Sequence, residues 1–305
     1  MLRKIVAGVD GRPGGADAAA LAAALAESET DVLLVGVYRD PLMPLPLTLG
    51  RDASLRAETE GVLHEVRETH APTARTEAVC DSFPARALRH VAEREHADVL
   101  VIGSTHRADR GDVGVGRRGR QMLHDASCPV ALAARDAAQD PGALRRIVVG
   151  FDGSPESRAA LAAAKALSGD DASRMTVVAV VEDQLPTSMV PFGAPPETGS
   201  WEQIVQARRQ EASELIDEAT AGSRAGGEVV VGDPSNALAK AAKGADLLVV
   251  GSRRWGPLAR IALGSTADDL TRRAPCSLLL VPRPVEAPAS GGDDGLAALE
   301  RIGGQ

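Results

Sequence analysis

The amino-acid sequence contains an internal repeat, and no other feature constrains its fold as strongly. Residues 2–15 (LRKIVAGVDGRPGG) return as residues 144–157 (LRRIVVGFDGSPES). Residues 96–105 (HADVLVIGST) return as residues 244–253 (GADLLVVGSR). Two separate blocks that recur in the same order indicate a tandem of two homologous halves rather than a chance match.

The repeat divides the chain into a first domain over residues 1–134 and a second over residues 144–283. We expect residues 135–143 to form a linker, because the apolar pattern lapses there and Asp140-Pro141-Gly142 is a turn signal. Residues 284–305 are rich in Pro, Ala and Gly, a composition that predicts a disordered tail.

Each half alternates short apolar runs with helical patterns, and its composition narrows the fold class. Apolar residues make up 44% of the 305 residues but aromatic residues only 2%, so the core must be packed from Val, Leu, Ile and Ala. Continuous apolar strands separated by Ala-rich helices are typical of parallel sheets that are covered on both faces. We therefore predict two tandem, doubly wound, five-stranded parallel α/β domains. In the second half, strands are expected at 146–151, 175–181, 228–231, 246–250 and 277–281, and helices after Ser154 and at 201–220, 235–243 and 265–273.

Charge and composition exclude several classes of function. The net charge is −8, from 34 basic and 42 acidic residues, which is unsuited to a nucleic-acid surface. No apolar run approaches the ~20 residues of a membrane span. Three cysteines form no disulfide framework, and the six histidines show no metal-ligand spacing. We expect a cytoplasmic protein with no metal site, in which Cys128 and Cys276 are buried as small apolar residues.

An acidic residue follows the first strand of each half. In open α/β sheets, ligands bind outside the carboxyl ends of the strands, where the strand order reverses. Gly150 and Asp152 follow the strand that opens the second half, and Gly8 and Asp10 are their counterparts in the first. A carboxylate at this place can accept hydrogen bonds from a ribose or a base. By position alone, a helix-capping or turn aspartate is the favoured alternative.

A second candidate segment combines glycines, hydroxyls and arginines. Glycine and a helix start bring backbone N–H groups close to an anion, and arginine suits phosphate. The spacing is neither a Walker A loop nor GxGxxG. The alternative is an ordinary glycine-containing loop with an N-cap serine. The candidate residues are Gly251, Ser252, Arg253, Arg254, Gly264, Ser265 and Thr266, with Gly103, Gly116 and Arg117 at matching places in the first half.

These segments resemble the universal stress protein family in tandem form. The likeness rests on VVGFDGSPESRAAL, VVVGDPSNALAKAA, DLLVVGSRRWGPLARIALGSTADDL and APCSLLLVP, and covers about residues 1–134 and 144–283. It implies that an adenine lies near Gly150, Asp152 and Val180, with the triphosphate against 251–254 and 264–266. The family pattern Gly-x2-Gly-x9-Gly-Ser/Thr has Arg254 in place of its second glycine.

The resemblance implies an ATP-binding stress or regulatory protein without catalytic residues, which takes ATP with or without Mg²⁺. The second half is expected to bind better, because the first has Arg117 where the second has Ser265. Two alternatives stay open: a slow ATP hydrolase on the same fold, and a nucleotide-free interaction scaffold. The final strands, about 130–134 and 277–281, are expected to pair as an internal pseudo-dimer, with a homodimer as a further partner.

Overall fold

The computed structural model of the chain describes most of both halves. Described are residues 2–39, 49–105, 108–116, 119, 123, 126, 128–139, 144–169, 171–183, 198–254, 261–262 and 264–282. Arg117, the predicted tail at 284–305 and the linker residues 140–143 therefore lie outside the described residues, as do the side chains of Arg253 and Arg254.

The strands form one sheet that runs through both halves, and the predicted α/β class is confirmed. In the first half the strand order is β3-β2-β1-β4-β5, and in the second it is β8-β7-β6-β9-β11. Neighbouring strands in these two orders are parallel, and only the short β10 pairs antiparallel, with β9, among the described residues of either half. The order reverses between β1 and β4 and between β6 and β9. The strands are β1 (Lys4–Val9), β2 (Asp31–Tyr38), β3 (Arg75–Cys80), β4 (Val99–Gly103), β5 (Val130–Ala133), β6 (Ile147–Gly150), β7 (Met175–Val181), β8 (Gly226–Val231), β9 (Leu247–Arg254), β10 (Ile261–Ala262) and β11 (Ser277–Pro282).

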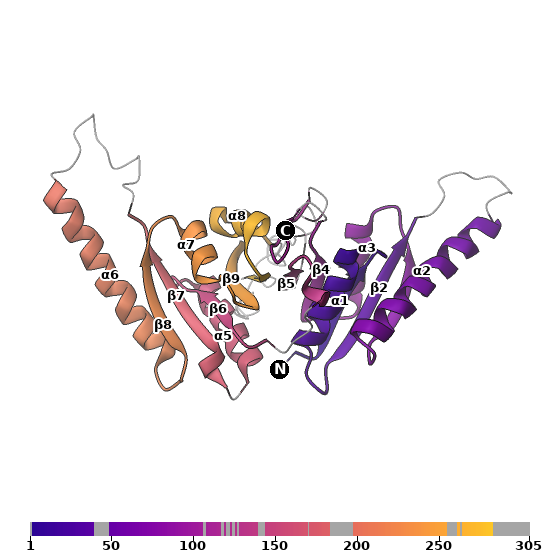
Figure 1. Ribbon diagram of the computed structural model, residues 1–305, viewed down its shortest axis with the longest axis horizontal. Coiled ribbons are helices and arrows are strands. Elements are labelled where there is room, and N and C mark those ends of the chain that lie inside the picture. The colour runs from indigo at the N-terminus through magenta and orange to yellow at the C-terminus, as the bar shows by residue number, and fades with distance from the viewer. Residues whose placement is uncertain are drawn as a thin grey trace, which may run out of the picture.

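The two halves meet through their last strands, as predicted. β5 and β11 pair antiparallel, with Leu132 against Leu278 and Val130 against Leu280. All four of these side chains are fully buried. Figure 1 shows this junction at the centre of the molecule, with the two halves spreading to either side. The pairing removes two apolar edges that would otherwise lie open to association.

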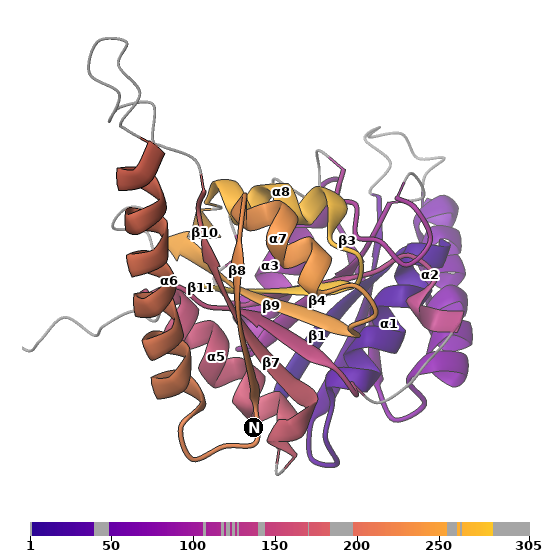
Figure 2. The same cartoon turned by 60° about the vertical axis from the view of Figure 1, so that its left-hand side comes forward.

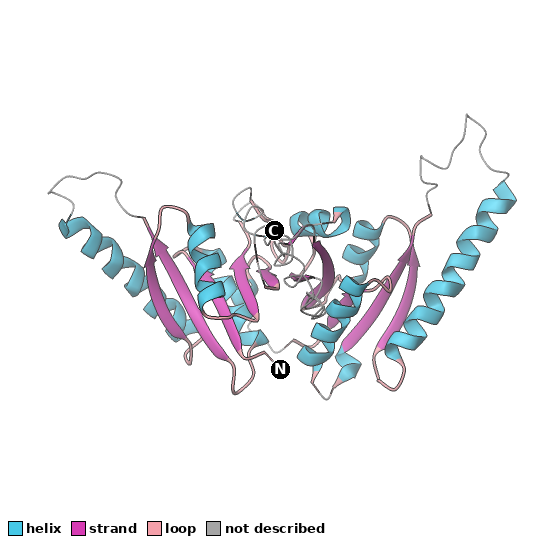
Figure 3. Ribbon diagram, turned by 180° about the vertical axis from the view of Figure 1, so that it is seen from behind, coloured by secondary structure: helices cyan, strands magenta, loops and turns pink. Residues whose placement is uncertain are grey.

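Helices cover both faces of the sheet, as a doubly wound fold requires. Alternate residues of one strand enter different cores: Ile5 of β1 packs with α1 and α2, whereas Val6 packs with α3. In the second half, α5 and α6 share the first face, and α7 and α8 cover the other (Figures 2 and 3). The helices are α1 (Pro13–Leu25), α2 (Leu49–His70), α3 (Pro84–Arg94), α5 (Pro155–Ser168), α6 (Thr198–Thr220), α7 (Pro234–Ala241) and α8 (Ser265–Arg273).

The local sequence explains where most of these helices start. Ser154 caps α5 by accepting a hydrogen bond from the Ser157 N–H, and Pro155 occupies the first turn. Observed bounds differ from the predicted ones by a few residues, and β9 is the clearest case because it continues to Arg254. Among the described residues, no helix has the length and apolar character needed to cross a membrane.

The first part of the predicted linker packs against the first half. A short 3₁₀ turn over Ala137–Gln139 follows β5. The buried carboxylate of Asp17, on α1, accepts hydrogen bonds from the N–H groups of Asp136 (3.1 Å) and Ala138 (2.9 Å). Residues 135–139 are therefore part of the folded first half.

Candidate functional site

The carboxyl edge of the second half places Asp152 at the point where the strand order reverses. β6 ends at Gly150, and its neighbours in the sheet are β7 and β9. Asp152 is exposed, and its Oδ1 accepts a hydrogen bond from the Ser154 N–H at 3.0 Å. This contact is an Asx turn, so the structural role considered from the sequence is present. Asp10 does the same in the first half, where it accepts from the Arg12 N–H at 3.2 Å.

The electrostatics of Asp152 favour a charged acceptor. Burial by itself raises the pKa of this carboxyl, but hydrogen bonds from Ser154 and Ser157 outweigh it and hold the pKa below its ordinary value of 3.8. The group is therefore ionised at neutral pH. It suits hydrogen bonding to a ribose hydroxyl or a base amino group better than proton transfer, which needs a pKa near the working pH.

Among the described residues, the start of α8 has no capping side chain, because its N-cap is a glycine. Gly264 is the N-cap and makes no side-chain capping hydrogen bond, whereas Ser154 and Asp233 cap α5 and α7. Ser265 is exposed and Thr266 is half-buried, and both belong to the first turn of this helix. An uncapped helix start with adjacent hydroxyls is a favourable environment for an anion.

A cavity that the sequence did not reveal lies against this helix start. Its volume is about 160 Å³, and it is formed by residues that follow β7, residues that follow β8, and the first turns of α8. Arg273 lies near it, donating to the Ser235 hydroxyl (2.6 Å) and standing 3.7 Å from Asp269. Four carboxylates line the cavity, from Glu182, Asp183, Asp233 and Asp269. Of these four residues, only Asp233 belongs to a recognisable sequence pattern, the helix-capping pair Asp233-Pro234.

The candidate glycines have packing roles that are independent of a ligand. A Cβ on Gly251 would lie 2.6 Å from the backbone of Glu156, so β9 needs glycine where the start of α5 crosses it. A Cβ on Gly150 would lie 3.1 Å from Leu238. Close packing therefore accounts for the glycine at position 251 without a phosphate ligand. Val180 is half-buried in β7, where it pairs with Val230.

Two further candidates lie at the end of β9. Arg254 has a strand conformation and pairs antiparallel with Ile261 of β10. Its backbone is therefore extended, a conformation that arginine adopts readily. The positive φ that a glycine at this place would permit is not used. The hydroxyl of Ser252 is buried and has no hydrogen-bond partner among the described residues. A buried, unpaired hydroxyl is costly, and it leaves an unused donor at this edge of the sheet.

The first half uses the corresponding residues differently. Ser104, the counterpart of Ser252, donates to the Ala133 carbonyl (2.6 Å) and accepts from the Gly114 N–H (3.1 Å), which holds its loop against the sheet. A Cβ on Gly103 would lie 1.8 Å from the Gly14 oxygen, so this glycine too is required for packing. The nearest contact for a Cβ on Gly116 would be Thr105, at 3.2 Å.

The same loop also reaches the second half. The Val113 N–H donates to the Ala274 carbonyl (2.8 Å) and the Val115 N–H to the Thr271 carbonyl (3.1 Å), both at the carboxyl end of α8. Val113 is fully buried. The loop thus satisfies free carbonyls of α8 and joins the two halves.

Cys276 is buried, as the sequence predicts, whereas Cys128 is half-buried. Burial raises the pKa of the Cys276 thiol to about 12. Burial likewise raises the pKa of Cys128 to about 11. Both thiols are therefore protonated at neutral pH. Among the described residues, no group of three or more His, Cys, Asp or Glu side chains is arranged to hold a metal ion.

Fold and site together define a tandem, doubly wound α/β protein with a candidate ligand edge at the strand-order reversal of its second half. A model of the universal stress protein family matches residues 1–134 and 143–282. The chain belongs to the universal stress protein family.

Individual relatives agree with this assignment. A universal stress protein of Mycolicibacterium smegmatis is 29% identical over 217 residues, which is 70% of each chain. One of Thermus aquaticus is 31% identical over 143 residues, 45% of this chain and 98% of its own. The fold is similar to that of a universal stress protein from Archaeoglobus fulgidus, with a TM-score of 0.63 at 18% identity, over 92% of this chain and 98% of that one.

Proposed function

We propose that the second half binds an adenine nucleotide, ATP, across the carboxyl edge of its sheet, and that the protein acts as a nucleotide-dependent stress or regulatory protein. The observation that carries this proposal is the start of α8, where Gly264 provides no capping side chain and Ser265 and Thr266 occupy the first turn. Membership of the universal stress protein family supports the same class of ligand.

Each part of the nucleotide has a matching group. Asp152, ionised and exposed, would accept hydrogen bonds from the ribose or the base next to Gly150 and Val180. The free N–H groups and hydroxyls at the start of α8 would donate to the phosphates. Ser252 would supply a further hydroxyl from β9. These groups come from β6, β7 and β9, which are neighbours around the strand-order reversal, and from α8, which packs against β9.

The acidic cavity makes a divalent cation part of this proposal. Asp269 belongs to the same helix as Ser265, and Asp233 lines the same cavity. A polyphosphate at the start of α8 would be repelled by these carboxylates unless a cation lay between them. Mg²⁺ commonly binds through one or two carboxylates together with phosphate oxygens. Binding of ATP is therefore expected to depend strongly on Mg²⁺.

We propose binding without catalysis. The lowered pKa of Asp152 makes this carboxylate a weak general base, and the second half contains no histidine. Slow hydrolysis assisted by Mg²⁺ and a positioned water is the alternative in which the same site acts as an enzyme. A nucleotide-free scaffold is the alternative in which the contacts between the halves are the main function.

Native mass spectrometry of the freshly purified full chain, before and after incubation with ATP and Mg²⁺, separates these three functions. The proposal predicts one ATP per chain that is retained unchanged over hours. Conversion of bound ATP to ADP would indicate the hydrolase. Absence of any nucleotide at saturating ATP and Mg²⁺ would contradict the proposal and favour the scaffold.

A further inference from the structure

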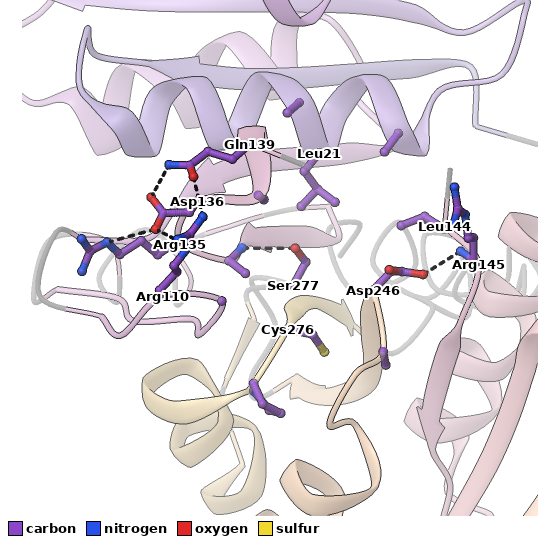
Figure 4. Close-up of a pocket in the computed structure, with 17 residues that line it drawn as sticks. Leu21, Arg110, Arg135, Asp136, Gln139, Leu144, Arg145, Asp246, Cys276 and Ser277 are labelled. Atoms are coloured by element: carbon purple, nitrogen blue, oxygen red, sulfur yellow. Dashed lines mark hydrogen bonds and ion pairs between the residues drawn. The ribbon is translucent and has the colours of Figure 1, made fainter. Parts of the chain in front are cut away.

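A cavity of about 400 Å³ lies between the two halves, and the function proposed above makes no use of it. On the first-half side it is bounded by Leu21 of α1 and by the turn that follows β5 (Figure 4). On the second-half side it is bounded by Arg145, Asp246 and Cys276, which precede β6, β9 and β11. It therefore lies at the amino ends of these strands, opposite the edge that carries Asp152. Its volume falls within the ~300–1,000 Å³ of small-molecule sites.

The first-half wall of the cavity is held in a conformation that costs energy. Asp136 has a φ of 66°, in the left-handed region that side chains rarely adopt. Its N–H and that of Ala138 both donate to the buried carboxylate of Asp17. The Ala134 N–H donates to the Ser277 hydroxyl across the junction between the halves, at 3.1 Å. The wall is thus fixed by the protein itself, and a ligand would meet a preformed surface.

Cationic groups face this cavity from both halves (Figure 4). Arg110 donates to the Gln139 amide oxygen (2.6 Å) and stands 3.4 Å from the Asp136 carboxylate. Arg135 stands 4.0 Å from the same carboxylate oxygen. Both guanidinium groups thus lie beside the Asp136 carboxylate, and that of Arg135 also donates to the Ala108 carbonyl (2.8 Å). Each guanidinium has five N–H donors, more than the partners that the described residues supply.

Arg145 contributes the third guanidinium, and it has no partner among the described residues. The nearby carboxylate, Asp246, is engaged elsewhere: its Oδ2 accepts from the backbone N–H groups of Arg145 (2.7 Å) and Arg146 (2.8 Å). The lining thus holds three arginines against two carboxylates, and a positive charge is left over. Leu21, Leu144 and neighbouring alanines supply an apolar part of the same lining.

We propose that this cavity binds a small organic oxyanion, a carboxylate or a phosphate monoester, that bridges the two halves. The planar forks of Arg145 on one side and of Arg110 and Arg135 on the other match the oxygens of such a group. The apolar lining receives its short carbon skeleton. Because the cavity lies opposite the nucleotide edge, this ligand and ATP bind independently, and neither proposal requires the other.

The chain provides a matched control for Arg145. Arg3 is the residue at the same place in the first repeat, and its backbone N–H donates to Asp98 as that of Arg145 donates to Asp246. Arg3 is exposed and lies outside this cavity. Arg145→Gln and Arg3→Gln therefore remove the same charge from equivalent positions, and only the first removes it from the cavity.

The test is a titration of the ¹⁵N-labelled full chain with succinate, with glycerol 3-phosphate and with inorganic phosphate. We expect saturable shifts of amides at 134–139 and 277 with succinate or glycerol 3-phosphate, which tells carboxylate from phosphate. Arg145→Gln should weaken this binding about tenfold or more, the worth of a charged hydrogen bond. Arg3→Gln should leave the affinity within about twofold, as expected for a distant charge.

Three outcomes would overturn the proposal. These are no saturable binding of either organic anion, equal weakening by both variants, and equal affinity for inorganic phosphate, which would leave the apolar lining without a role. Arg145→Gln should not change ATP binding. If the unaltered protein binds succinate or glycerol 3-phosphate but not ATP, the nucleotide proposal alone is contradicted.

Discussion

Ser104 and Ser252 occupy the same place in the repeat, directly after Gly103 and Gly251, and they differ in the hydrogen bonds that they make. Ser104 makes two hydrogen bonds that close its loop, and that loop continues to α8 through Val113 and Val115. In the first half, the loop after β4 joins the two halves. In the second half, the corresponding hydroxyl, that of Ser252, makes no hydrogen bond with the described residues.

This difference shows how a duplicated fold can separate two roles that one domain would have to combine. α8 belongs to both: its uncapped start faces the candidate nucleotide edge, and its carboxyl end is held by the first half. The glycines that both halves retain, Gly103 and Gly251, are explained by close helix–strand approach rather than by ligand binding. Retained glycines are therefore weak evidence for two working sites.

The largest expected effect concerns nucleotide affinity. Asp152→Ala combined with Ser265→Ala should lower ATP affinity by about a hundredfold or more, because each change removes a hydrogen bond involving a charged group. Asp10→Ala, the matched change in the first half, should leave the affinity within about twofold. Isothermal titration with Mg²⁺ measures both. An equal loss from Asp10→Ala would place a working site in the first half and break the comparison.

Replacing a closely packed glycine by alanine in either half should lower the free energy of unfolding. Gly103→Ala places a Cβ 1.8 Å from the Gly14 oxygen, and Gly251→Ala places one 2.6 Å from Glu156, so both should lose roughly 2–3 kcal/mol of unfolding free energy. Gly61→Ala, in the exposed interior of α2 with no atom near its Cβ, should instead gain about 0.5–1 kcal/mol. Urea unfolding tests all three. A Gly251→Ala variant of normal stability that fails to bind ATP would restore the ligand role of this glycine.

The two serines allow a sharper test. Ser104→Ala leaves the Gly114 N–H without its acceptor and should cost about 1–3 kcal/mol of stability. Ser252→Ala removes a hydroxyl that makes no hydrogen bond with described residues, so it should be neutral or slightly stabilising. Its effect should appear as weaker ATP binding. Equal destabilisation by the two variants would mean that Ser252 is bonded within the protein.

A further effect is an acid sensitivity to which Glu95, in the first half, contributes. Hydrogen bonding to Lys4, then to Arg75 and Arg94, lowers the pKa of Glu95 to about 2 from 4.5. Because the folded-state pKa is lowered, the stabilisation is present above pH 4.5 and is lost as the pH falls from 4.5 towards 2. We expect about 1 kcal/mol, since the partners are partly exposed. Glu95→Gln should remove this slope from urea unfolding measured between pH 5 and 3; an unchanged slope would exclude Glu95 as its source.

Periodicity and the repeat were sufficient to predict the fold. Helix α8 was predicted with its observed bounds, 265–273, because Gly264-Ser265 marks its start and Leu270 lies on its buried face. The pairing of β5 with β11 followed from two apolar final strands that each needed a neighbour. β8 was predicted two residues too short, because Gly226 and Gly227 carry no apolar signal.

The site was less predictable, since it depends on contacts between distant segments. The acidic cavity joins residues that follow β7, residues that follow β8 and the start of α8, and no local pattern links them. The bonds from Val113 and Val115 to α8 join backbone groups, which leave no mark on residue type. Assigning Gly251 to a phosphate overlooked the backbone of Glu156 beside it, which only the folded chain brings there.

The most direct test of the central claim, that the second half holds the only working nucleotide site, is the stoichiometry of ATP binding to the full chain in the presence of Mg²⁺. Isothermal titration should give one ATP per chain, with the signal lost on removal of Mg²⁺ by EDTA. Two equivalent sites per chain would contradict the claim. So would one site that survives Asp152→Ala with Ser265→Ala.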